Sequence, residues 1–118
     1  MSKTTATLDI SAELAGIHAA VYEREHERVT TTLDDDVAVC VLRIALLPAE
    51  KLLISHRHHD AVHGQRQALE HALEPAMSAA VERATGRTVT TFLAETHFDP
   101  NLTLLIFRFA PAAGLLAA

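Results

Sequence analysis

The segment DVAVCVLRI, residues 36–44, constrains the fold more than any other part of the chain. It is short, apolar at nearly every position and rich in β-branched valine, which favours a buried strand over a helix. A sheet covered on only one face alternates apolar and polar residues along its strands, and this segment does not. We therefore expect both faces of the strand to be covered. The two sets of side chains are Val37, Val39 and Val41 on one face and Ala38, Cys40 and Leu42 on the other.

Three further segments have the character of strands. ERVTTTL, residues 27–33, is short and β-branched, and the aspartates at 34 and 35 suit a tight turn, so a hairpin is expected there. TVTTFLAETHF at 88–98 and LTLLIFRFA at 102–110 form a second predicted hairpin around the turn signal DPN. The last strand is again apolar on both sides, with Leu104 and Ile106 opposing Leu105, Phe107 and Phe109.

Helical patterns separate these hairpins. From Leu8 to about Arg24, apolar residues recur at spacings of three and four, which predicts an amphipathic helix. Pro48 can open a second helix that runs to about Ala84, with a break or kink near residues 55–60 and at Pro75. TGR at 85–87 supplies a glycine stop.

The resulting order is α-β-β-α-β-β over a single domain, residues 1–118. It predicts an α+β, two-layer domain in which helices pack on one face of an antiparallel sheet of about four strands. The second sheet face is also apolar, and in so small a chain another copy of the sheet is the expected cover. We therefore predict a homo-oligomer. Its interface residues are Val37, Val39, Val41, Leu104 and Ile106.

Composition excludes several classes of function. The net charge of -5 gives no electrostatic reason to bind nucleic acid or an anionic membrane. Aromatic residues make up only 4% of the chain, which argues against base stacking. The single cysteine, Cys40, is typical of a reducing cytoplasm, and the N-terminus does not have the pattern of a signal peptide. The longest apolar stretch, residues 37–49, falls short of the roughly 20 residues that span a bilayer as a helix.

Four of the eight histidines lie in SHRHHDAVHG, residues 55–64. On a helical wheel the apolar side holds Ala61, Val62, Ala68, Leu69, Ala72, Leu73, Ala76 and Ala80. The opposite side holds His56, His59, Asp60, His63, Gln67 and Glu70.

Three interpretations of this polar side stay open. It is a solvated helix face, as in most amphipathic helices. Alternatively, His59 and His63, one turn apart, bind zinc or nickel together with His56, and the protein is a metal or small-ligand sensor. A third possibility is a cluster that becomes charged between about pH 5 and 7 and loosens an interface.

Other constellations are weaker. LDDDV at 33–37 lacks the glycine and distal glutamate of a calcium loop. His97 and Asp99 form an acid–base pair that an enzyme could use near Arg66 or Arg108, but no nucleophile accompanies them. Cys40 reads as a small buried hydrophobe. We therefore expect a protein that is not an enzyme and has no cofactor.

Several stretches resemble the bacterial MpsC-like family, named for a proposed sodium-linked system that generates membrane potential. The likeness runs from the first helix to the last strand. The matching elements are the aspartate before the V-x-V-x-V-L strand, PAE at 48–50, Arg66, VERATGRTV at 81–89 and HFDPN at 97–101. The residues that carry the motif are Glu50, Arg66, Gly86, Arg87, Asp99 and Pro100.

The resemblance implies a cytoplasmic accessory domain that acts with a membrane ion or bicarbonate transport system through an integral membrane subunit. The chain departs from the family pattern at REHERVTT, residues 24–31, where a Gly-Arg-Gly-Pro turn is usual. The histidine-rich stretch is also particular to this chain. Pairing of Glu50 with Arg66, within the chain or between subunits, is left open by the sequence.

Overall fold

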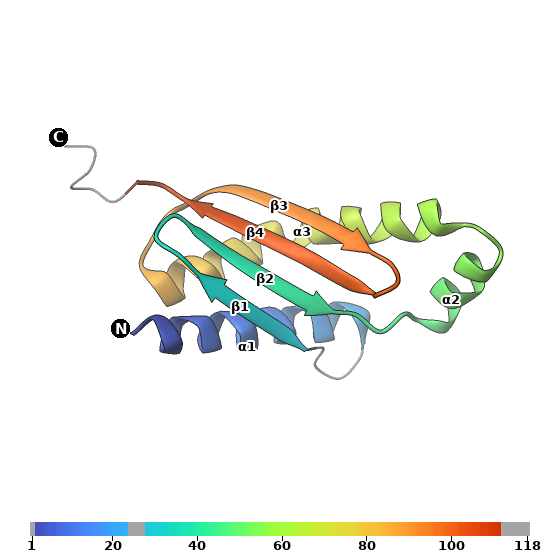
Figure 1. The fold of residues 1–118 in the computed structure, drawn as a ribbon, viewed down its shortest axis with the longest axis horizontal. Helices are drawn as coiled ribbons and strands as arrows, with labels where there is room; N and C mark the ends of the chain where they lie inside the picture. Colours follow the sequence, from blue (N-terminus) through green and yellow to red (C-terminus); the bar gives the residue numbers. More distant parts are fainter. Residues whose placement is uncertain (1, 24–27, 112–118) are drawn as a thin grey trace.

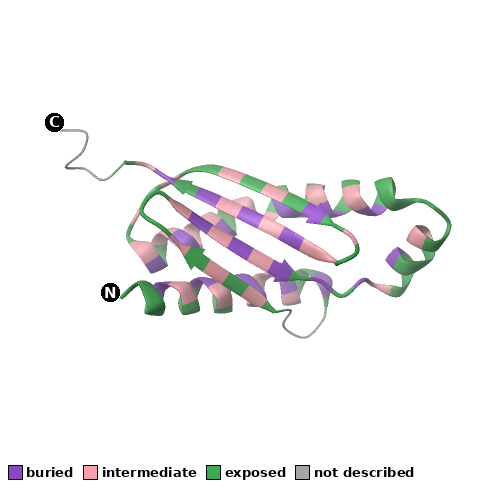
Figure 2. Cartoon of the chain, viewed as in Figure 1, coloured by how far each residue is buried: buried purple, intermediate pink, exposed green. Residues whose placement is uncertain are grey.

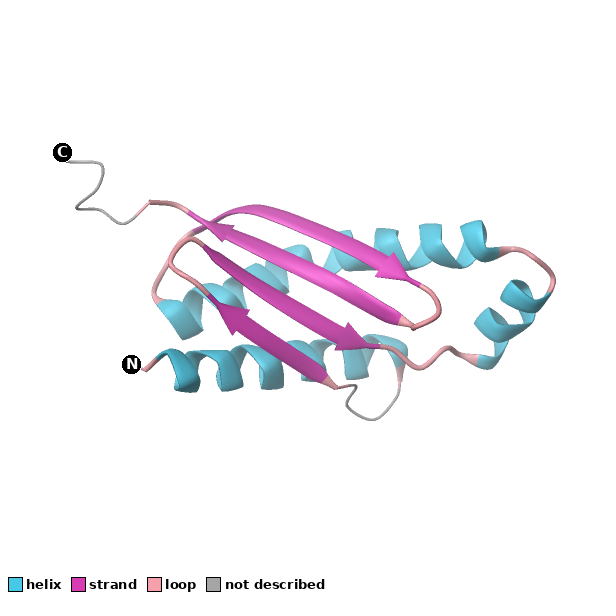
Figure 3. Cartoon of the chain, in the orientation of Figure 1, coloured by secondary structure: helices cyan, strands magenta, loops and turns pink. Residues whose placement is uncertain are grey.

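The computed structural model describes residues 2–23 and 28–111 as a two-layer α+β domain (Figure 1). A four-stranded antiparallel sheet forms one layer, and helices lie behind it (Figure 3). The predicted fold class is therefore confirmed. The elements are α1 (Lys3–Tyr22), β1 (Val29–Leu33), β2 (Val37–Arg43), α2 (Pro48–Ser55), α3 (His59–Thr85), β3 (Val89–His97) and β4 (Leu102–Phe109).

The sheet has the strand order β1-β2-β4-β3. Each predicted hairpin is present, and the two hairpins join through antiparallel pairing of β2 with β4. The two central strands are therefore the two most apolar ones, and β1 and β3 are the edges. Because β1 and β2 follow α1 whereas β3 and β4 follow α3, each helix packs against its own edge of the sheet.

Side chains alternate between the two faces as predicted. Ala38, Cys40 and Leu42 point into the core with Leu105 and Phe107, and all five are fully buried. This face packs against the buried stripes of α1 and α3. The apolar core therefore lies between the helices and one face of the sheet.

The first helix begins earlier than predicted. Its first residue is Lys3 rather than Leu8, because the Ser2 hydroxyl accepts the N–H of Thr5 and caps the helix. It ends at Tyr22, and the predicted end at Arg24 lies outside the described residues. The following strand begins at Val29; the predicted start at Glu27 also lies outside them.

The predicted break near residues 55–60 is confirmed and separates α2 from α3. Arg57 adopts a left-handed backbone, with φ of 66°, and the N–H groups of 56–58 bond back to carbonyls of α2. The chain turns there without a glycine. By contrast, α3 continues through Pro75, although proline removes one helical hydrogen bond. Figure 1 shows α2 and the start of α3 projecting beyond the end of the sheet.

The wheel assignment for α3 was right for Val62, which is buried, and for His59 and Asp60, which are exposed, but wrong at several other positions. Glu70, placed on the solvent side, is buried, and Gln67 is half-buried. The alanines at 61, 68, 72 and 76, placed on the core side, are exposed. Alanine discriminates weakly between the two environments, and the buried stripe in the first half of α3 carries polar groups that are satisfied in pairs. Its buried residues are Val62, Arg66 and Glu70, followed by Met77, Ala80, Val81 and Ala84.

Candidate functional site

The face of the sheet that points away from the helices has an apolar centre. Figure 2 shows buried and less buried residues alternating along its central strands. Strand pairing places Val39 beside Ile106, and Ile106 beside Leu93. The next row along the strands places Val41 beside Leu104. Leu93 is 56% exposed, and the central residues are half-buried. The open face is made of Val37, Val39, Val41, Leu93, Leu102, Leu104 and Ile106, which include all five predicted interface residues.

Charged side chains border this open face. On this face, Arg43 lies at one end of the apolar side chains of β2, and Arg108 lies at one end of those of β4. Glu95 lies beside Leu104, on the edge strand β3. All three residues are exposed. The face therefore combines an apolar centre with a polar rim of both signs, which is the organisation of a protein–protein interface.

A buried ion pair joins α2 to α3. The Arg66 guanidinium donates from Nε to Oε2 and from Nη2 to Oε1 of Glu50, both at 2.8 Å. The Glu50 carboxylate also accepts the N–H of Leu47, the cap of α2. Arg66 lies over the ring of Tyr22, 4.4 Å from its centroid. The pairing left open by the sequence therefore forms within one chain, and it holds the projecting α2 against α3.

A second buried pair joins α1 to α3 one turn further along. His18 Nε2 lies 2.7 Å from Glu70 Oε1, and both side chains are buried. Since the carbonyl of Leu14 only accepts, His18 Nδ1 must donate to it, at 2.7 Å. One proton therefore lies between His18 Nε2 and Glu70, and the pair is neutral overall wherever that proton resides. This is a structural pair, since water does not reach it.

The three histidines proposed as metal ligands make different contacts in the structure. His63 Nε2 lies 2.8 Å from Oε1 of Glu95 on β3. His59 and His63 both pack edge-on against Phe98. His56, at the end of α2, bonds to the carbonyl of Leu52 instead. Among residues 2–23 and 28–111, no three His, Cys, Asp or Glu side chains are grouped to hold a metal ion.

The two arginines considered for acid–base chemistry do not lie beside His97. His97 pairs with Leu102 at one end of the β3–β4 hairpin, whereas Arg108 lies opposite Thr91 at the other. Arg66 is committed to Glu50 in the interior. Within the hairpin turn, His97 Nδ1 bonds to the carbonyl of Pro100. Burial raises the pKa of the Cys40 thiol to about 11, so this sulfur is protonated and unreactive at neutral pH.

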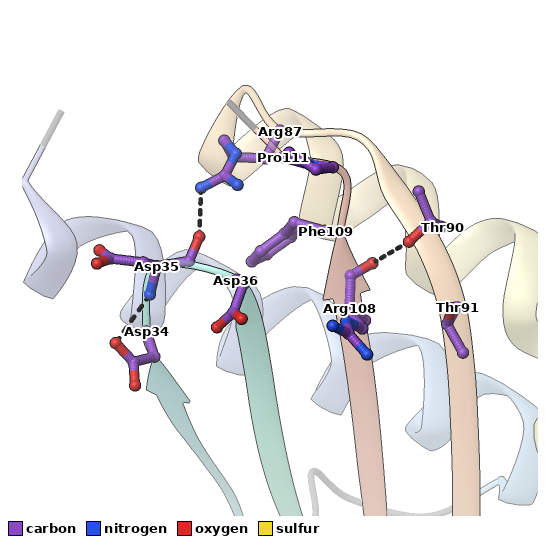
Figure 4. Close-up of a pocket in the computed structure, with 9 residues that line it drawn as sticks. All are labelled: Asp34, Asp35, Asp36, Arg87, Thr90, Thr91, Arg108, Phe109 and Pro111. Atoms are coloured by element: carbon purple, nitrogen blue, oxygen red, sulfur yellow. Dashed lines mark hydrogen bonds between the residues drawn. The ribbon is translucent and has the colours of Figure 1, made fainter. Parts of the chain in front are cut away.

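An open hollow of about 980 Å³ lies at the other end of the sheet (Figure 4). The aspartates at 34–36, which form the β1–β2 turn, line one side of it, and Arg108 lines the other. Arg87 bridges this end by donating to the carbonyls of Asp35 and Ala110, and it lies over the Phe109 ring. The arginine therefore lines the hollow and, through these two carbonyls, also ties both hairpins together.

The remaining motif residues lie where the chain changes direction. Gly86 ends α3 in a left-handed conformation, with φ of 70°. Asp99 also has positive φ, at 58°, and precedes a cis bond to Pro100 in the turn between β3 and β4. The N–H of Asp99 donates to Oδ1 of Asn101. The backbone carbonyl of Asn101 accepts the N–H of Ile44. The motif residues therefore determine the turns of the chain and the contacts that hold it together.

These observations define the class of protein: a two-layer α+β domain that presents an apolar sheet face with a charged rim. Over the described residues, none of the helices combines the length and hydropathy that crossing a bilayer requires. The chain belongs to the MpsC family, described as "Na+-translocating membrane potential-generating system (MpsC)", whose profile matches residues 2–111. This confirms the resemblance noted from the motifs. No curated protein and no solved structure matches the chain.

Sequence reasoning missed two relationships. The pairing of His18 with Glu70 spans 52 residues and has no local pattern. The contact of Gln67 with the edge strand β3 was hidden by its place among solvent-facing residues. The one indication in the sequence of the buried side of α3 was Arg66, a motif residue with apolar neighbours in the helical pattern.

Proposed function

We propose that this protein is a non-enzymatic accessory module of a membrane ion or bicarbonate transport system, and that it assembles with itself through the open face of its sheet. The observation that carries the proposal is the uncovered apolar centre formed by β2 and β4. Membership of the MpsC family supports the link to a membrane-potential-generating system. The partner in the membrane is then an integral subunit of that system.

A second copy of the chain fits the open face in size. Strands lie about 4.8 Å apart and rise about 3.3 Å per residue, so four strands of seven residues cover about 450 Å² in projection. Two facing copies bury about 900 Å² before the relief of the side chains is added, which approaches the size of a specific interface. The arginines and Glu95 on the rim allow two copies to pair opposite charges.

Light scattering on purified protein tests self-assembly. Val39→Asp places a carboxylate at the centre of the open face and is expected to give a monomer, because burying an unpaired charge in an interface is costly. Ala72→Asp adds the same charge on the exposed side of α3 and is the matched control; it should keep the wild-type mass. A folded Val39→Asp protein with unchanged mass would contradict the proposal.

Crosslinking and affinity capture from membranes of the native host test the accessory role. The expected result is one integral membrane transport subunit, recovered with wild-type protein and with Ala72→Asp. Recovery of the protein alone, from the soluble fraction, would contradict the link to transport while leaving self-assembly intact. Broad screening for turnover tests the non-enzymatic part, and activity lost in His97→Ala would overturn it.

A further inference from the structure

Strand β3 forms one edge of the sheet, and helix α3 lies beside it. The strand is nine residues long and contains no proline or lysine, which are two common means by which proteins keep an edge strand from pairing with another molecule. Its one irregularity is a register shift between Val89 and Thr91, near its start. An edge of this kind needs some other protection along its middle and end.

The side chain of Gln67 on α3 supplies that protection. Its amide nitrogen donates to the carbonyl of Ala94 at 2.9 Å, and its amide oxygen accepts the N–H of Thr96 at 3.1 Å. These are the two backbone groups that one residue of a neighbouring parallel strand would bind, opposite Glu95. The carboxamide therefore takes the place of the backbone N–H and C=O of one residue from another strand.

Neighbouring side chains at intervals of four residues along α3 extend this contact. His63 pairs with Glu95, and His59 packs on Phe98 just beyond the strand. His71 packs edge-on against Phe92, with ring centroids 5.8 Å apart. At the start of the strand, Glu82 of the same helix accepts the N–H of Val89. The histidines of α3 are thus part of a seam between this helix and the edge strand.

We propose that this seam, formed by His59, His63, Gln67 and His71, closes the β3 edge against strand pairing with a second copy of the chain. Gln67 is its central element, because its carboxamide binds two backbone groups of β3 itself. Closure of this edge keeps β3 from competing with the open face in assembly, and this part of the inference rests on the proposed function. The closure itself does not.

Amide hydrogen exchange measured by NMR on the full chain tests the closure. Gln67→Ala should increase the exchange rate of the Thr96 N–H about fivefold, the factor that corresponds to a net hydrogen bond of about 1 kcal/mol. Gln65→Ala changes the same residue type at an exposed position of the same helix and should leave that rate unaltered. An unchanged Thr96 rate in Gln67→Ala would overturn the inference.

Light scattering on a Val39→Asp background tests the consequence for assembly. Val39→Asp with Gln67→Ala should form species whose mass grows with concentration, whereas Val39→Asp with Gln65→Ala should not. Equal masses for the two double variants at every concentration would overturn the role in assembly. If Val39→Asp alone is not monomeric, the proposed face is wrong, but the exchange measurement still decides the closure. Gln67→Met, which keeps the length of the side chain, replaces Gln67→Ala in both experiments if the alanine variant does not fold.

Discussion

Arg66 and Glu50 form a two-pronged ion pair in which the arginine side chain is 1% exposed and the glutamate 10%. The pair fastens α2 to α3, and it is the reason that two short motif elements 16 residues apart belong together. Its charges are already desolvated, so each partner depends on the other.

Removing one partner of this pair should be strongly destabilising. Arg66→Met takes the guanidinium and its two hydrogen bonds away from the buried Glu50 carboxylate, and the expected loss in the free energy of unfolding is about 3–5 kcal/mol. Urea denaturation measures it. The exposed pair of Arg83 with Glu13 is the control, since Arg83→Ala should cost less than about 1 kcal/mol. Equal losses in the two variants would mean that Arg66 is not held as described.

The His18–Glu70 pair should tolerate an amide but not an alanine. Glu70→Gln keeps a hydrogen bond, because its amide N–H can donate to Nε2 of a neutral His18 whose Nδ1 still binds Leu14. We expect a cost of about 1 kcal/mol for Glu70→Gln and about 3 kcal/mol for Glu70→Ala, which leaves a cavity and removes the hydrogen bond to His18 Nε2. Denaturation at neutral pH compares them, and an amide variant as unstable as the alanine variant would contradict the shared-proton geometry.

Cys40 should make stability fall at alkaline pH. Burial raises the pKa of the thiol from 9.0 to about 11, so the folded state keeps a proton that the unfolded state releases. The stabilisation is fully present below about pH 9 and is lost as the pH rises towards 11, by about 2–3 kcal/mol in total. The stability difference between wild type and Cys40→Ala, measured at pH 8 and pH 10.5, isolates this contribution. A difference that does not shrink with pH would contradict it.

The two glycines of the α3 region should respond in opposite directions to the same change. Gly64 lies inside the helix, and a Cβ there meets no atom within 4 Å, so Gly64→Ala should stabilise the protein by about 0.5–1 kcal/mol. Gly86 has equal space but a left-handed backbone, so Gly86→Ala should destabilise it by about 1 kcal/mol. Thermal unfolding of both variants gives the signs, and stabilisation by both would show that Gly86 does not adopt this conformation.

The strands and the alternation along them were predictable because their evidence is local. Valine-rich segments bounded by DD and DPN define hairpins, and a period of two assigns Val39 and Cys40 to opposite faces whatever the rest of the chain does. The break before α3 was also visible. The start of α1 was missed because one capping hydroxyl, Ser2, outweighs an absence of apolar periodicity.

The sequence by itself determined the α+β class, the two apolar sheet faces and the family, since each depends on residues close together in the chain. Only the tertiary structure decided the strand order and the orientation of α3. The helical wheel placed Glu70 on the solvent side because a wheel considers each side chain by itself. The burial of Glu70 is possible only because His18 lies beside it. The same holds for Gln67, whose partners on β3 are backbone groups that no sequence pattern reveals. Long-range polar pairing is set by how the layers meet, and that is a property of the fold rather than of any segment.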